Sequence, residues 1–374
     1  MSKYDSIRFF NDEEVNAQIQ NIAPHPMFKS LLRFTFPEIT EEETKQLLSS
    51  IHSIQEFHEK FITKTMERIV ATTSDGVSLL GFEHLDNSKS YLYISNHRDI
   101  LLDSSLLNVN LMKHGQIMTA SAIGDNLVQK SFLMDLAKLN RNFIVKRKAS
   151  PRELLLNSQL LSEYISDLIQ KENRSVWIAQ REGRTKDGND ATHSGVLKMI
   201  AMAAPKNEMI AHLKNLRIVP VSMSYEYDPT DKLKMPQLLA QMQDLEYIKE
   251  KNEDFINLMS GVIGQKKRIH IHIGTPLDTE FDEVAQETDN TTKQIQLITK
   301  CIDKQIIANY KLWPTNYIAH DLLHNTKTYQ NQYDEQEKQL FLRRLEMRVD
   351  KSNPLIVQKF LEMYANPVIN KNAL

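Results

Sequence analysis

Hydrophobic positions in the first 75 residues recur at the three- and four-residue spacing of amphipathic helices. The clearest run lies between residues 41 and 70, directly after Thr40-Glu41-Glu42-Glu43, which has the form of a capping box. We therefore expect one long helix over 41–70, within an N-terminal helical region that covers residues 1–75.

After the turn signal Thr73-Ser74-Asp75-Gly76, short apolar runs alternate with helix-like segments. This alternation predicts an α/β fold, with a mixed, mostly parallel sheet flanked by helices. We expect the α/β domain to span residues 76–280, with C-terminal helices over 281–374 packed on it. The expected strands are 77–82, 91–94, 116–120, 142–145, 175–179, 216–221 and 268–273, and the expected helices lie around 100–112, 127–139, 151–171 and 194–204.

Composition narrows the class of protein. Hydrophobic residues make up 41% of the chain and charged residues 25%, as in ordinary globular proteins. A formal net charge of −2 argues against nucleic acid as a partner, so any phosphate site must be local. No run reaches the roughly 18 apolar residues of a membrane-spanning helix. The single cysteine and a start without signal-peptide features predict a cytoplasmic protein.

Candidate chemistry gathers where the expected strands end. His97, Asp99 and Asp103 follow the strand at 91–94, Lys146-Arg147-Lys148 follow the strand at 142–145, and the polar segment 181–188 follows the strand at 175–179. In open α/β folds ligands bind outside the carboxyl ends of the strands. If these strands are parallel, the three segments meet at one edge of the sheet.

Four segments in this order resemble the motifs of the glycerolipid acyltransferases: SNHRDILLD (95–103), FIVKRK (143–148), REGRTKDG (181–188) and VPVSMSYEYDP (219–229). They are most similar to the glycerol-3-phosphate and dihydroxyacetone-phosphate members. Two spacings differ. His97 and Asp103 are separated by five residues where the family has four, and Glu182-Gly183-Arg184 is one residue shorter than the family's Glu-Gly-x-Arg.

The resemblance implies that His97 removes the proton of an acceptor hydroxyl. Histidine suits this role because its ordinary pKa, about 6.5, lies close to neutral pH. A carboxylate on the other ring nitrogen fixes the tautomer, as in a serine hydrolase triad. Asp103 is the first choice of partner. Asp99 is the alternative, although an aspartate at this place can simply cap the helix that follows.

The resemblance further implies that Arg184 and Lys186 bind the phosphate of the acceptor, since both match the third motif. Basic residues of the second motif, Lys146 and Arg147, would assist, and Glu182 would orient the loop or contact the acceptor. The expected substrate-binding set is Arg98, Lys146, Arg147, Glu182, Gly183, Arg184 and Lys186.

The resulting expectation is transfer of a fatty acyl group from acyl-CoA or acyl-carrier protein to glycerol 3-phosphate, in phospholipid biosynthesis. Lysophosphatidate (1-acylglycerol 3-phosphate) is the alternative acceptor, and a catalytically silent protein that binds acyl-CoA or lipid phosphates is the alternative of another class. No cofactor is expected. No metal is expected either, because His270 and His272 share a strand face but lack a third ligand. We expect a cytoplasmic protein with peripheral contact at the inner face of the membrane.

Overall fold

The computed structural model describes residues 2–147 and 150–374, and its centre is a seven-stranded sheet in the order β1-β7-β6-β2-β5-β3-β4. Strands β2 to β6 run parallel to one another, whereas β7 pairs antiparallel with β6 and parallel with β1. The expected α/β fold with a mixed, mostly parallel sheet is therefore confirmed. The strands are β1 Ser74–Leu80, β2 Leu92–Ser95, β3 Thr119–Gly124, β4 Asn142–Val145, β5 Ser175–Ala179, β6 Ile218–Tyr225 and β7 Lys267–Ile273.

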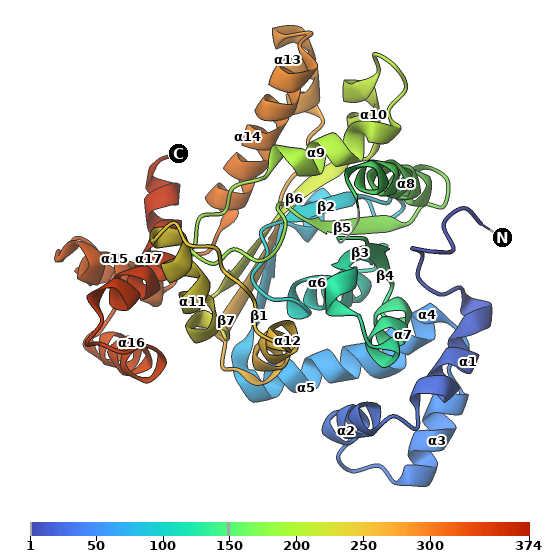
Figure 1. The fold of residues 1–374 in the computed structure, drawn as a ribbon, viewed down its shortest axis with the longest axis horizontal. Helices are drawn as coiled ribbons and strands as arrows, with labels where there is room; N and C mark the ends of the chain where they lie inside the picture. Colours follow the sequence, from blue (N-terminus) through green and yellow to red (C-terminus); the bar gives the residue numbers. More distant parts are fainter. Residues whose placement is uncertain (1, 148–149) are drawn as a thin grey trace.

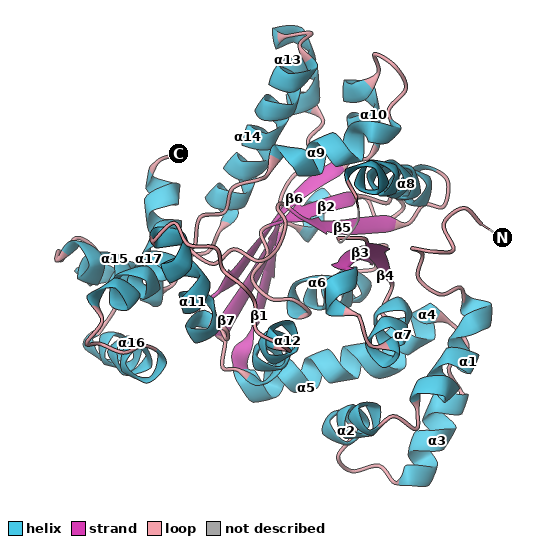
Figure 2. Ribbon diagram, viewed as in Figure 1, coloured by secondary structure: helices cyan, strands magenta, loops and turns pink. Residues whose placement is uncertain are grey.

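Helices cover both faces of this sheet (Figure 2). Side chains along β2 alternate between the two faces. Tyr93 belongs to the apolar core on one face, and Leu92 and Ile94 belong to the core on the other. The first core is closed by α5 Thr63–Thr73, α6 Leu102–Lys113 and α7 Ser131–Leu139. The second is closed by α8 Pro151–Gln170, α9 Ser194–Ile200, α10 Met209–Asn215, α13 Thr279–Glu287 and α14 Thr291–Asn309.

The N-terminal region corrects one expectation. The single helix expected over 41–70 is wrong: the chain forms α3 Glu41–Ser49, breaks, and resumes as α4 Ile54–Phe57, a π-helical turn His58–Ile62 and α5. Ser53 ends the break because its side chain caps the new helix, accepting from the Glu56 N–H at 3.1 Å. The capping box at Thr40 and Glu43 is confirmed. Two further helices precede this region, α1 Asp12–Ile22 and α2 Pro26–Thr35.

The C-terminal helices form a third apolar core beside the sheet, at the left of Figure 1. They are α15 Pro314–His324, α16 Glu335–Arg348 and α17 Pro354–Asn372, and they pack on α11 Asp231–Met242. Between α11 and β7 lies α12 Glu253–Ile263. Short 3₁₀ turns occupy Phe82–His84, Asp125–Leu127, Ala201–Ala203 and Gln330–Gln332. Within the described ranges, no helix combines the length and the apolar character that crossing a bilayer requires.

A buried histidine makes the stability of this fold sensitive to acid. His58 lies in the core, where burial and the Arg141 guanidinium lower its pKa to about 3. In the unfolded chain the imidazole of His58 is therefore protonated as the pH falls below about 6.5, whereas in the folded protein it stays neutral until about pH 3. Stability should be full above pH 6.5 and fall as pH drops towards 3, by up to about 1.4 kcal/mol per pH unit.

Replacing this residue should flatten that dependence. We expect His58→Leu to make the free energy of unfolding less steep between pH 6.5 and 5, as measured by urea titration at several pH values. His52→Leu is the matched control, because His52 is exposed. Equal slopes in both variants and in the parent would contradict the role given to His58.

Candidate active site

His97 stands in the turn between β2 and α6, paired with Asp103. The two are joined by a hydrogen bond between Nδ1 and Oδ2 at 2.8 Å. The same Oδ2 accepts from the backbone N–H groups of Arg98 (2.6 Å) and Asp99 (3.0 Å), so the turn wraps around the carboxylate. Tyr225 donates its hydroxyl to Oδ1 at 2.9 Å. Because His97 precedes the helix, the turn absorbs the additional residue of its spacing to Asp103.

The structure gives Asp99 a different task. Its Oδ1 accepts from the backbone N–H groups of Leu101 (2.9 Å) and Leu102 (2.8 Å), so Asp99 caps the first turn of α6. Burial and the nearby charge of Asp103 raise the pKa of Asp99. Of the two carboxylates considered from the sequence, Asp103 is the one that contacts the imidazole.

The rest of the imidazole is held but not enclosed. The ring of Trp177 meets it edge-on, with 5.5 Å between ring centroids, and Trp177 is itself fixed by donating to the Ser95 hydroxyl at 2.9 Å. The second ring nitrogen, Nε2, has no hydrogen-bond partner among the described residues, and the side chain is 13% exposed. The ring is therefore oriented through Nδ1 and free at Nε2, which is the arrangement a general base requires.

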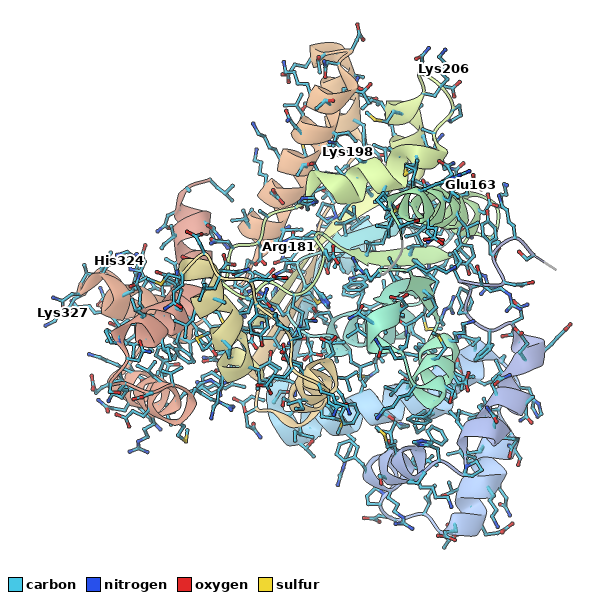
Figure 3. All side chains as sticks on the ribbon, viewed as in Figure 1. Glu163, Arg181, Lys198, Lys206, His324 and Lys327 are labelled. Carbon is cyan, nitrogen blue, oxygen red and sulfur yellow. The ribbon has the colours of Figure 1, made fainter. Side chains whose placement is uncertain are left out.

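The loop after β5 lies against this turn, as the sequence predicted from the parallel strands. The Thr185 N–H donates to the backbone carbonyl of His97 at 2.8 Å. Gly183 has a φ of +72°, in the left-handed region that favours glycine, and this bend carries the loop back to His97. Arg181, at the start of the loop, is labelled near the centre of Figure 3.

Arg184 is positioned by a buried polar network that the sequence did not reveal. Its Nη1 donates to the hydroxyl of Thr230 at 2.9 Å, and Thr230 in turn donates to Asp228 at 2.9 Å. Lys234 is buried, pairs with Asp228 and donates to the Thr185 carbonyl at 3.0 Å. Asp228 lies within the fourth motif, residues 219–229, so a sequence signal includes it. Lys234 carries no such signal, since a lysine in a helix is ordinarily solvent-exposed.

The C-terminal helices hold the same loop from its other side. Asn366 of α17 donates to the Asp187 carbonyl at 2.7 Å, and Arg344 of α16 donates to the Asp228 carbonyl at 2.7 Å. Gly188 packs against the backbone of α17, where an added Cβ would lie 2.4 Å from the Met363 carbonyl oxygen. Residues far apart in sequence thus determine where Arg184 and Lys186 lie.

Lys186 is partly buried beside Arg184. Burial and the neighbouring guanidinium lower the pKa of its ammonium group to about 8. Its Nζ lies 5.9 Å from the centre of the Tyr247 ring, which belongs to the segment between α11 and α12. An anionic ligand beside Lys186 would stabilise the charged form of this ammonium group.

The other expected substrate-binding residues divide into two groups. Lys146 and Arg147 are exposed, and Arg147 forms an ion pair with Glu182, with Nη1 and Oε1 2.8 Å apart. Glu182 therefore contacts the second motif across the site, while Lys148 lies outside the described residues. Arg98 is buried and pairs with Asp190, which also accepts from Asn96. Arg98 therefore helps to fix the turn, and its guanidinium is engaged by Asp190 instead of facing a substrate.

Helix α12 packs over the turn at Asp99. A Cβ added to Gly261 would lie only 2.0 Å from Oδ2 of Asp99, so glycine is what permits this approach. We expect Gly261→Ala to destabilise the protein by about 1–3 kcal/mol through overpacking, despite the higher helix propensity of alanine. Urea unfolding beside Ser260→Ala measures this effect. Equal stability of the two variants would show that α12 does not depend on the contact.

The cavities and the histidine strand lie elsewhere. One cavity of about 830 Å³ lies between α9, α10, α13 and α14, and another of about 500 Å³ is lined by residues that include His84, His272 and Cys301. His270 is hydrogen-bonded to Ser78 at 2.8 Å. Over residues 2–147 and 150–374, no group of three or more histidine, cysteine or acidic side chains is arranged to hold a metal ion.

Comparison with known proteins found two similarities. Residues 77–224 match the family model described as Acyltransferase. Among solved structures, the chain is similar to the 1-acyl-sn-glycerophosphate (LPA) acyltransferase PlsC from Thermotoga maritima. That similarity has 12% sequence identity and a TM-score of 0.38, and covers 78% of this chain and 94% of the other. No curated protein matches the chain.

Proposed function

From the acyltransferase family match of residues 77–224, we propose that this protein transfers an acyl group from a thioester to the hydroxyl of a phosphate-bearing glycerol. The donor would be acyl-CoA or acyl-carrier protein. The observation that carries the proposal is the His97–Asp103 pair, with Nε2 free and the loop of Arg184 and Lys186 attached to the His97 carbonyl. The family match covers the turn, this loop and most of β6, but not the C-terminal helices that support them.

The reaction follows from the geometry of the histidine. Nε2 accepts the hydroxyl proton as the acceptor oxygen attacks the thioester carbonyl carbon. Asp103 holds the Nδ1–H and stabilises the imidazolium that forms. Collapse of the tetrahedral intermediate breaks the carbon–sulfur bond, and the imidazolium returns its proton to the departing thiolate. The acceptor supplies the nucleophile, so no enzyme serine or cysteine is required.

Arg184 and Lys186 are the proposed phosphate ligands. A guanidinium offers two parallel N–H groups to phosphate oxygens, while an ammonium acts as a point charge. Arg184 is already oriented through Thr230, which lowers the entropic cost of binding. Lys146 and Arg147 remain proposed as outer contacts, since both are exposed at the same edge of the sheet.

For the acceptor we place lysophosphatidate before glycerol 3-phosphate. Tyr247, which lies beside Lys186, is flanked by Leu245 and Ile248, exposed to 60% and 79%. Apolar side chains near Lys186, which is proposed to bind the phosphate, suit an acceptor that already carries an acyl chain. Glycerol 3-phosphate, the acceptor expected first from the sequence, has no apolar part for these residues to contact.

The test is release of free thiol from palmitoyl-CoA or palmitoyl-acyl-carrier protein by the purified chain. Reactions contain lysophosphatidate, glycerol 3-phosphate or no acceptor, and the acylated product is identified by mass spectrometry. We expect product to require an acceptor, with lysophosphatidate giving the higher kcat/KM. Binding of acyl-CoA without turnover on either acceptor or donor would favour the silent binding protein instead.

The pKa of Lys186 predicts how acceptor affinity depends on pH. The ammonium is charged below about pH 8 and loses its proton above it. If Lys186 binds the phosphate, the KM for the acceptor should rise above pH 8, by about tenfold when the cation is fully lost. Lys186→Met should have the raised KM at every pH, so its profile would be flat there. A rise of the same size in the variant would show that another group titrates.

A further inference from the structure

Three consecutive leucines project from the start of α8, and we call Leu154, Leu155 and Leu156 the leucine tip. Their exposed fractions are 36%, 61% and 61%. Successive helix residues are rotated by about 100°, so three in a row cover more than half of the helix circumference. A helix that lies on a protein core exposes its polar face instead, as α8 does further along, where Glu163 is labelled in Figure 3. The leucine tip therefore presents an apolar surface to solvent.

Cations precede the leucine tip in the sequence. Lys146, Arg147 and Arg152 are exposed on the segment that leads into it. The acidic residue within this segment, Glu153, is held in the capping box of α8, where its Oε2 accepts from the N–H and the hydroxyl of Ser150 at 2.8 and 2.7 Å. Apolar side chains beside lysine and arginine are the combination that binds at the surface of an anionic bilayer.

The leucine tip lies at the edge of the sheet that carries His97. Strands β2, β3, β4 and β5 are parallel, so the segment after β4 and the turn after β2 leave the sheet at the same edge. The ion pair between Arg147 and Glu182 joins this segment to the loop of Arg184. Figure 1 shows α8 almost end-on, above β5 and beside α9. A surface that contacts the leucine tip would thus adjoin the candidate active site.

We propose that the leucine tip inserts into the interface of a bilayer that contains anionic phospholipid. The inference rests on the proposed function, because an enzyme that joins acyl chains to glycerol phosphate uses and makes molecules that reside in membranes. A second copy of the chain is the weaker occupant. In a two-fold dimer the same patch would face itself, bringing Lys146, Arg147 and Arg152 against their own copies.

Vesicle sedimentation tests the proposal with the intact chain and no substrate. We expect the wild-type protein to sediment with vesicles of phosphatidylcholine and phosphatidylglycerol, more strongly than with phosphatidylcholine alone, and less at high salt. Leu155→Asp combined with Leu156→Asp should lower the partition coefficient by at least about tenfold, because two apolar side chains no longer enter the interface. Met347→Asp is the control, since Met347 is 73% exposed on α16, away from this edge.

A second measurement does not depend on a charged variant. In Leu155→Trp, the added indole should shift its emission to the blue on anionic vesicles and be quenched by brominated lipid, because it enters the acyl region. Equal sedimentation of the parent and the double aspartate variant would overturn the proposal. Failure of the parent to bind anionic vesicles would also overturn it. The same holds if light scattering shows that the only effect of the substitutions is the loss of a dimer. Since neither measurement uses turnover, an inactive protein that binds vesicles would count against the proposed function alone.

Discussion

Replacement of His97 by alanine is expected to reduce acyl transfer by about 10²–10⁴-fold, the usual contribution of a general base. The loss should appear in kcat, because the imidazole accepts the proton in the transition state and does not contribute to substrate binding in the ground state. Thiol release from palmitoyl-CoA in the presence of acceptor measures it. Removing the ring deletes its Nδ1 hydrogen bond to Asp103, but Asp103 still accepts from the N–H groups of Arg98 and Asp99 and from the Tyr225 hydroxyl, so the fold should be retained.

Two controls make this result specific. Urea unfolding of His97→Ala should give a stability close to that of the parent, which would exclude general unfolding as the cause. His324→Ala removes an exposed histidine of α15 and should retain full transfer. Normal transfer by the His97 variant would mean that another group accepts the hydroxyl proton.

Replacement of Asp103 by asparagine should cost roughly 10³-fold or more, because a neutral amide cannot stabilise the imidazolium and can favour the wrong tautomer. Oδ2 of the carboxylate accepts from the N–H groups of Arg98 and Asp99, and Oδ1 accepts from the Tyr225 hydroxyl. An asparagine keeps only one oxygen, so its NH₂ group cannot accept from the donors at the other position. Some loss of stability should therefore accompany the loss of rate. Steady-state kinetics beside urea unfolding separates the two effects.

Asp99→Asn is the matched variant for this prediction. An asparagine Oδ1 can still accept from Leu101 and Leu102, so the cap of α6 survives. We expect transfer to stay within a few-fold of the parent. If Asp99→Asn instead abolished transfer while Asp103→Asn did not, the pairing seen in the structure would not be the one that operates in the reaction.

The strands and the histidine turn could be predicted from the sequence because their signals are local. Short apolar runs between turn residues indicated the seven strands, and β4 and β5 begin and end where the pattern indicated. The positions of His97, Lys146 and Arg184 at one edge then followed from the rule for parallel strands. The N-terminal helix was mispredicted for a local reason as well, because apolar spacing continues through residues 50–53 while Ser53 begins a new helix.

The contacts around Arg184 could not be predicted, because they join distant parts of the chain. Lys234 is buried only because Asp228 and the Thr185 carbonyl neutralise and solvate its ammonium group. Arg98 matched a motif beside the histidine, yet its orientation depends on Asp190, 92 positions later. The leucine tip has the spacing of an ordinary buried helix. Its exposure depends on which parts of the folded chain pack against α8, and these are distant in sequence.

The most direct test of the proposed acyl transfer is the rate of CoA release from palmitoyl-CoA by the purified protein, with and without lysophosphatidate, for the parent and for His97→Ala. We predict that release requires the acceptor, yields an acylated glycerol phosphate, and is lost in the variant. Release that is independent of the acceptor, or equally fast without His97, would contradict it.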